Sequence, residues 1–206
     1  MPRLLYAPTS PYVRKVMVCA HLCGMADRIV LLDSAAHPIR RDPRIAAHNP
    51  LAKVPTLILD DGQSLYDSRV ICEYIASLAA NQDLFPPAGP GRWRALTGQA
   101  LGDGLLDAAL LARYETTARP AGSQWPEWRA AQLVKVAASL DEIEAHAPAA
   151  AASGPSIGEV TIGCALGYLD FRFPELDWRA SHPRAASWFQ VFNAQPAMQA
   201  TLPRDA

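Results

Sequence analysis

The chain has 206 residues, enough for one large domain or two small ones with a hydrophobic core. Half of its residues are apolar and 19% are charged, a balance that argues against intrinsic disorder. The formal net charge of −1 gives no electrostatic reason to expect nucleic acid or an acidic membrane as a partner, and no apolar run approaches the length of a membrane-spanning helix.

The first predicted elements are two strands joined by a helix. Leu4–Tyr6 predicts a strand that begins so early in the sequence that we do not expect a cleaved signal peptide. Ile29–Leu32 predicts a second, buried strand, which should run parallel to the first because a helix connects them. Residues 34–48 contain two prolines and should form an irregular connection.

The helix between these strands has clear start and stop signals. Ser10 is a good N-cap, and Pro11 suits the first helical position. Arg14 and Lys15 should face outward, and Gly24 is a natural C-terminal stop. The predicted buried stripe consists of Val13, Val16, Met17 and Ala20.

A hairpin is predicted next, with strands at residues 56–59 and 64–66 separated by turn residues. Val54 should be extended because it precedes a proline. Pro55 cannot donate a hydrogen bond to a neighbouring strand, so the chain before it is free to face a ligand.

A second helix start follows the hairpin. Asp67 and Ser68 are both good N-cap residues, and they precede an apolar pattern of helical period (Val70, Ile71, Tyr74, Ile75 and Leu78). The proline and glycine density of residues 81–92 then marks a domain boundary.

Beyond that boundary the strand signals vanish. Helices are predicted at 93–119, 127–147, 160–171 and 184–194. The segment from Ser156 to Glu159 is a capping box, which satisfies two main-chain donors at a helix start. Trp125 and Trp128 should serve the core of this helical region.

Four cysteines are present, and all lie in apolar helical patterns: Cys19, Cys23, Cys72 and Cys164. No histidine or carboxylate spacing completes a metal site around them, so we expect small buried hydrophobic side chains and no metal. A reducing, cytoplasmic setting follows.

The stretch Asn49-Pro50-Leu51-Ala52-Lys53-Val54-Pro55-Thr56-Leu57, with the later Tyr66-Asp67-Ser68, closely resembles the glutathione-binding signature of cytosolic glutathione transferases. The order of the predicted elements also matches the thioredoxin-like fold of that family, and the resemblance covers nearly the entire chain. It implies an α/β plus all-α architecture. The expected parts are a thioredoxin-like glutathione-binding domain at 1–80, a linker at 81–92 and an all-helical, bundle-like substrate-binding domain at 93–206.

The resemblance also implies how glutathione, the co-substrate, is held. In the family the Val–Pro bond is cis, and the residue equivalent to Val54 pairs its main chain with the cysteinyl part of glutathione. Asp67 and Ser68 match the residues that grip the γ-glutamyl end, where a helix N-terminus favours a carboxylate. Lys53 would suit the glycyl carboxylate as a flexible cation.

Three further residues, His37, Arg40 and Arg41, lie near where the family contacts that same carboxylate, but we expect at least two of them to be only solvated.

Ser10 is the candidate catalytic residue. The string Ser10-Pro11-Tyr12 resembles the Cys-Pro-Tyr of glutaredoxins and omega-type transferases, with a hydroxyl in place of the sulfur. A hydroxyl at a helix tip can donate to the glutathione sulfur while the helix dipole favours the thiolate, which is the nucleophile. Thr9 and Tyr6 are the second and third candidates for this role.

Without a cysteine at this position, the chain cannot form a mixed disulfide with glutathione there. Conjugation, thiolysis or a glutathione-assisted isomerisation remains available. The expected second substrate is a small, largely apolar electrophile that contacts Tyr12, Tyr114 and Arg119. Asp103 and Asp107 should form a solvated acidic face, although Asp103 could reach glutathione bound to a partner subunit.

Two functions therefore compete. The first is a serine-type glutathione S-transferase that acts as a cytoplasmic homodimer in detoxification, without nucleic acid or membrane partners. The alternative is a non-catalytic glutathione- or partner-binding protein on the same fold. The missing cysteine disfavours a third possibility, a glutathione-dependent oxidoreductase.

Overall fold

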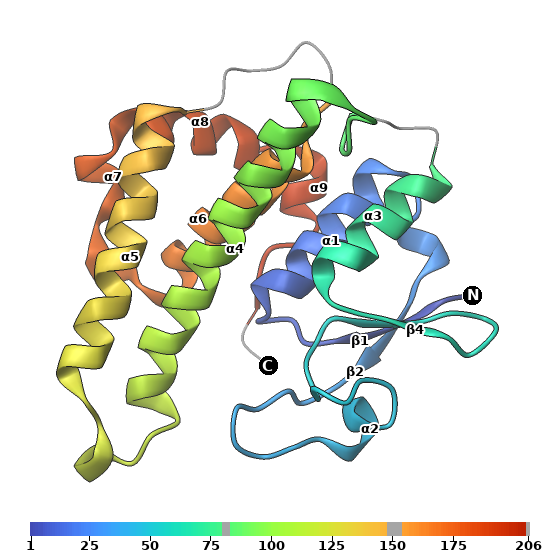
Figure 1. The fold of residues 1–206 in the computed structure, drawn as a ribbon, viewed down its shortest axis with the longest axis horizontal. Coiled ribbons are helices and arrows are strands. Elements are labelled where there is room, and N and C mark those ends of the chain that lie inside the picture. Colours follow the sequence, from blue (N-terminus) through green and yellow to red (C-terminus); the bar gives the residue numbers. More distant parts are fainter. Residues whose placement is uncertain (80–82, 148–153, 205–206) are drawn as a thin grey trace. The chain divides into compact units, whose positions relative to one another are not determined.

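The structure is a computed structural model that describes residues 1–79, 83–147 and 154–204 (Figure 1). The chain divides into two compact units. The first contains the described residues of Met1–Gly89 and Pro196–Ala206, and the second is formed by those of Pro90–Gln195. Within the described ranges, none of the helices combines the length and apolarity needed to cross a lipid bilayer.

The first unit is built on a four-stranded sheet in the order β2-β1-β3-β4. The strands are β1 (Arg3–Tyr6), β2 (Val30–Asp33), β3 (Thr56–Ile58) and β4 (Ser64–Leu65). β1 pairs with β2 in parallel, as the connecting helix predicted, whereas β3 is antiparallel to both β1 and β4.

Side chains of the two central strands alternate between the faces of this sheet. Leu5 and Ile58 pack with Ile45 of the short helix α2 (Pro43–Ala46) on one face. The other helices of this unit are α1 (Pro11–Leu22), the 3₁₀ helix η1 (Ala26–Arg28), α3 (Ser68–Leu78) and α9 (Pro196–Gln199). Figure 1 shows α1 and α3 on the opposite side of the sheet from α2. The predicted thioredoxin-like class is confirmed for this unit.

The prediction that Arg14 and Lys15 face outward is wrong. They are 6% and 0% exposed, because α1 packs against both α3 and α9 and has almost no free face. Arg14 Nη2 donates a hydrogen bond to the main-chain oxygen of Met198, over 3.2 Å. The helix ends as predicted, with Gly24 at a φ of 63° just beyond it.

The second unit is helical throughout its described part. It contains most of α4 (Gly89–Thr117), then η2 (Ala121–Ser123), α5 (Pro126–Ala145), α6 (Ile157–Arg172), η3 (Pro174–Leu176), α7 (Trp178–Ser181) and α8 (Pro183–Asn193). α4 begins within the stretch predicted as a linker at 81–92, since Pro90 is tolerated in the first turn of a helix. Residues 81 and 82 of that stretch lie outside the described residues.

Helix α6 is buried along nearly its whole length. It starts with the predicted capping box, in which Ser156 and Glu159 bond each other's main-chain N–H groups. α4 approaches it through glycines: a Cβ added at Gly102 would lie 2.9 Å from Thr161 Cγ2, and one at Gly158 would lie 2.8 Å from the Ala95 oxygen.

The prediction that Trp125 and Trp128 serve the core is wrong. They are 59% and 40% exposed, and their rings stack on each other with centroids 6.4 Å apart. Both lie at the start of α5, whose buried side chains come later in the helix at Gln132, Val136, Leu140 and Ile143.

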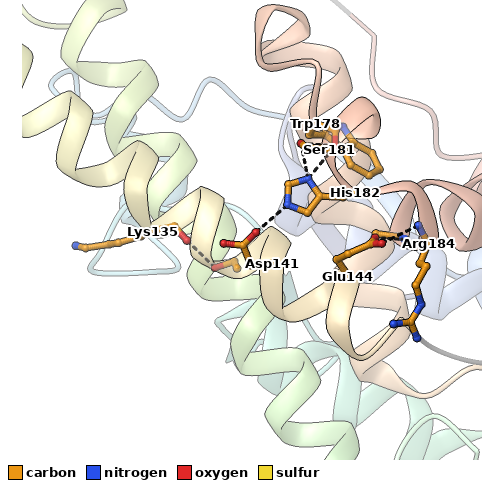
Figure 2. A network of polar contacts seen from close by, with 9 residues as sticks. Lys135, Asp141, Glu144, Trp178, Ser181, His182 and Arg184 are labelled. Carbon is orange, nitrogen blue, oxygen red and sulfur yellow. Dashed lines mark hydrogen bonds and ion pairs between the residues drawn. The ribbon is translucent and has the colours of Figure 1, made fainter.

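Polar contacts join α5 to the α7–α8 segment, as Figure 2 shows. His182 Nε2 lies 3.2 Å from Asp141 Oδ1, and its Nδ1 lies 2.9 Å from the Trp178 main-chain oxygen. Glu144 of α5 accepts hydrogen bonds from the main-chain N–H groups of Arg184 and Ala185, which belong to the first turn of α8.

Candidate functional site

Three segments that carry predicted site residues leave the same edge of the sheet. β1 ends there, because Leu5 is paired with Thr56 at the start of the antiparallel strand β3. β4 also ends there, because Leu65 is paired with Leu57 in a second antiparallel ladder. The topology therefore brings together the turn that leads into α1, the loop that precedes β3 and the start of α3.

Ser10 lies at the start of α1, where it is the N-cap. Its Oγ accepts a hydrogen bond from the Val13 N–H at 3.3 Å, and its own N–H bonds the Ala7 oxygen at 3.0 Å. The side chain is half-buried, and its hydroxyl hydrogen has no acceptor among the described residues. A sulfur anion placed here would meet both this donor and the positive end of the helix dipole.

The other candidates for thiol activation have different surroundings. Burial raises the pKa of the Tyr6 phenol above its ordinary value, and the charge of Arg204 offsets this only in part. Thr9 precedes the helix start and is half-buried, as is Tyr12, the predicted substrate-binding residue in the first turn of α1.

The loop before β3 is folded around the side chain of Asn49, which is 2% exposed. Its Nδ2 donates to the Lys53 oxygen at 3.1 Å and to Thr56 Oγ1 at 3.0 Å, and its Oδ1 accepts from the Leu51 N–H at 2.9 Å. This role of Asn49 was not predicted from the sequence. The available signal was the tendency of asparagine to bond the main chain two residues on.

Val54 and Pro55 end this loop, and the bond between them is cis, as the resemblance implied. The main-chain N–H and C=O groups of Val54 make no hydrogen bond to any described residue. Lys53 is exposed beside them. A peptide ligand could therefore pair with Val54 much as a neighbouring strand would.

Asp67 and Ser68 form the start of α3. Asp67 is exposed, and its Oδ1 caps the helix by accepting from the Arg69 N–H at 2.9 Å. Ser68 is 3% exposed, and its hydroxyl makes no hydrogen bond to the described residues. The peptide bond between Tyr66 and Asp67 is also cis.

Two of the three polar residues in the irregular connection, His37 and Arg41, make hydrogen bonds to the main chain. The prediction that at least two of the three are only solvated is therefore wrong. His37 Nδ1 accepts from the main-chain N–H groups of Ile39 and Arg40, each at 3.1 Å. Arg41 Nη2 donates to the Pro50 oxygen at 3.1 Å and so fastens the connection to the loop around Asn49.

In the second unit, Tyr114 is half-buried, and burial raises the pKa of its phenol. Arg119 is engaged elsewhere, because its Nε lies 2.8 Å from Oε1 of the buried Glu115. Asp107 is exposed as predicted, but Asp103 is 1% exposed and contributes nothing to a solvated acidic face. Across the described residues, no group of three or more His, Cys, Asp and Glu side chains could hold a metal ion.

Comparison with known protein families gives two matches. Residues 9–78 match the glutathione S-transferase N-terminal domain, and residues 126–190 match the glutathione S-transferase C-terminal domain. The GST-like protein YibF of Escherichia coli K12 is 29% identical over 99% of this chain and 100% of its own length.

Two solved structures of a glutathione transferase family member from Pseudomonas fluorescens Pf-5 are each 43% identical to this chain. The first, with bound glutathione, has a TM-score of 0.96 and covers 100% of both chains. The second, with bound S-(propanoic acid)-glutathione, has a TM-score of 0.91 and covers 99% of this chain and 100% of its own.

Proposed function

Because the chain belongs to the glutathione S-transferase family, we propose that it binds glutathione and that Ser10 activates the thiol for attack on a small electrophile. The observation that carries this proposal is the main chain of Val54, whose N–H and C=O groups bond no other described residue and which lies at the same sheet edge as two helix N-termini. The similar Pseudomonas protein holds glutathione, which supports the same ligand here.

The tripeptide suits this edge chemically. Val54 offers one N–H and one C=O to the cysteinyl residue, as a strand offers them to its neighbour. The free carboxylate of the γ-glutamyl group would lie at the start of α3, near the Ser68 hydroxyl, which bonds no other residue that the structure describes. The exposed carboxylate of Asp67 would pair with the ammonium group. Lys53 would reach the glycyl carboxylate.

Ser10 would lower the thiol pKa of bound glutathione without covalent chemistry. Its hydroxyl donates to the sulfur, and the dipole of α1 favours the negative charge. Comparable helix-tip surroundings lower thiol pKa values by roughly one to several units, which enlarges the reactive thiolate fraction at neutral pH. The thiolate of glutathione would then attack a carbon of the electrophile and form a C–S bond, with glutathione keeping its sulfur; the conjugate that the Pseudomonas relative holds contains such a bond.

We also propose that the protein is a cytoplasmic homodimer that serves detoxification. None of the four cysteines forms a disulfide bond, in keeping with a reducing compartment. Sedimentation analysis of the purified chain would test the dimer, because a monomer at micromolar concentration would contradict it.

The thiolate absorbance of bound glutathione, measured against pH, tests the central proposal. The native protein should lower the thiol pKa, and Ser10→Ala should return it toward that of free glutathione while glutathione still binds. Thr9→Ala and Tyr6→Phe serve as matched controls and should leave the lowered value in place. Binding without any pKa change would instead favour a non-catalytic glutathione-binding protein, and no binding would overturn the site.

A further inference from the structure

The main-chain oxygen of Lys53 is held inside the first unit by two buried side chains. It accepts hydrogen bonds from Asn49 Nδ2 at 3.1 Å and from Thr56 Oγ1 at 2.9 Å. Asn49 is 2% exposed and Thr56 is 0% exposed, so water has little access to either bond. Asn49 Nδ2 also donates to Thr56 Oγ1 at 3.0 Å, which closes a set of three hydrogen bonds, here called the Asn49–Thr56–Lys53 ring.

This ring fixes the direction of the Val54 N–H. The peptide bond between Lys53 and Val54 is trans, and in a trans peptide plane the C=O and the N–H that follows it point in opposite directions. Because the Lys53 C=O points to Asn49 and Thr56, the Val54 N–H points away from them. It bonds none of the residues that the structure describes. A peptide ligand at this edge would therefore meet a donor that is already oriented.

The loop that carries Val54 does not favour this conformation by itself. Ala52 has a φ of 51°, in the left-handed region that residues other than glycine rarely adopt. Such a conformation persists where surrounding contacts enforce it. Here the Ala52 N–H bonds the Asn49 oxygen at 2.8 Å, and the Asn49–Thr56–Lys53 ring holds the next residue along the chain. Loss of part of the ring should let the peptide plane between Lys53 and Val54 rotate.

The Thr56 hydroxyl serves both of its partners in the ring. It donates its one hydrogen to the Lys53 oxygen and accepts a hydrogen from Asn49 Nδ2. Valine has nearly the same shape as threonine but no hydroxyl. In Thr56→Val the Lys53 oxygen would keep one hydrogen bond, and Asn49 would be left with a buried N–H that lacks an acceptor.

We propose that Thr56 is a positioning residue for glutathione, whose hydroxyl orients the Val54 N–H toward the cysteinyl part of the tripeptide. This inference rests on the proposed function. Thr56 is buried, so it acts through the peptide plane between Lys53 and Val54 and does not contact the ligand. A donor that is oriented before binding does not have to be ordered during binding, which improves affinity. The thiol pKa, in contrast, would be set by Ser10 at the start of α1.

The test measures glutathione affinity by calorimetry, together with the thiol pKa of bound glutathione, in matched threonine variants of the full chain. Thr56→Val should raise the dissociation constant by about tenfold and leave the lowered thiol pKa in place at saturating glutathione. Thr56→Ser keeps the hydroxyl and should bind within about threefold of the native affinity. Thr161→Val is the matched control and should bind as the native protein does. Thr161 is also 0% exposed, and its Oγ1 donates to the Ile157 oxygen at 2.7 Å, but it lies in α6 of the second unit.

Hydrogen exchange of the Val54 amide separates a positioning role from a general loss of stability. In the native protein, saturating glutathione should slow exchange of this amide, and in Thr56→Val the slowing should be about tenfold smaller. Amides of the ladder between β1 and β3 should keep their protection in both proteins. If glutathione left Val54 exchange unchanged in the native protein, the proposal would be refuted whatever the variants do.

Native affinity in Thr56→Val, an equal loss in Thr161→Val, or no recovery in Thr56→Ser would also overturn the positioning role. The proposed function would survive each of these outcomes as long as the native protein binds glutathione and lowers its thiol pKa. Absence of glutathione binding by the native protein would instead end both proposals.

Discussion

The side chain of Asn49 donates a hydrogen bond to the main-chain oxygen of Lys53, with Nδ2 and O 3.1 Å apart. The same nitrogen bonds Thr56 Oγ1, so one buried amide ties the loop to the start of β3. Between these two contacts lies Val54, whose main-chain N–H and C=O groups bond none of the residues that the structure describes. Asn49 therefore fixes the position of the proposed peptide-binding edge without contacting the peptide.

Replacement of Asn49 should weaken both the fold and ligand binding. Asn49→Ala loses three hydrogen bonds in a buried setting and should lower the free energy of unfolding by about 1–3 kcal/mol. Glutathione affinity, measured by calorimetry, should fall by about tenfold or more. Asn49→Asp keeps the acceptor for the Leu51 N–H but loses both donors, so it should be similarly impaired. Unchanged affinity in Asn49→Ala would contradict this role.

A cysteine at position 10 should change the chemistry of the site. In Ser10→Cys the thiol lies at the start of α1, where thiol pKa values fall by roughly one unit or more, and it should form a mixed disulfide with oxidised glutathione. Intact-protein mass measurement would detect the adduct. The native protein and Ser10→Ala are the controls and should gain none, since Cys19, Cys72 and Cys164 are buried and burial raises the pKa of the Cys23 thiol.

The close approach of α4 to α6 should not tolerate added volume. Gly102→Ala and Gly158→Ala would each place a methyl group within 3 Å of main-chain atoms of the facing helix, and each should lower the free energy of unfolding by about 1–3 kcal/mol. Gly104→Ala is the matched control, because nothing lies within 4 Å of its added Cβ. That variant should be unchanged or stabilised by up to about 1 kcal/mol. Denaturant unfolding measures all three, and equal effects would contradict the glycine contact.

Acid should loosen the irregular connection through Asp42. Its pKa is lowered from 3.8 to about 2, first by a hydrogen bond from the Arg44 side chain and then by the Ala35 N–H. Because the folded-state value is depressed, this contribution to stability is present above about pH 4 and is lost as the pH falls through about 2. Titration of the Asp42 carboxyl carbon by NMR should give the low value in the native protein and a higher one in Arg44→Ala. The same midpoint in both proteins would refute this explanation.

Local signals predicted most of the elements because start, stop and turn residues act on their own neighbourhood. Ser10, Gly24 and the box from Ser156 to Glu159 behave as their residue types predict. Burial was harder to predict, since it depends on distant segments. Lys15 lies on a polar face by sequence, but α3 and α9 also cover α1, and α9 comes from the far end of the chain.

The candidate site likewise has features that local sequence signals predict and features that depend on how the chain folds. The segments that carry Ser10, Val54 and Asp67 were predicted from sequence and share one sheet edge. The hydrogen bonds of Asn49 to Lys53 and Thr56 were not predicted, because they depend on how the loop folds back on the start of β3.

The hydrogen bonds that the Glu144 carboxylate accepts should couple the local unfolding of α5 to that of α8. Helix α8 has no capping side chain at its own N-cap, His182, and the two donors of its first turn bond Glu144 of α5 instead. Local unfolding of α5 would therefore remove the hydrogen bonds that cap α8, together with the packing of α8 against α5. We expect the amides of these two helices to exchange with deuterium as one cooperative unit, although about forty residues separate them along the chain.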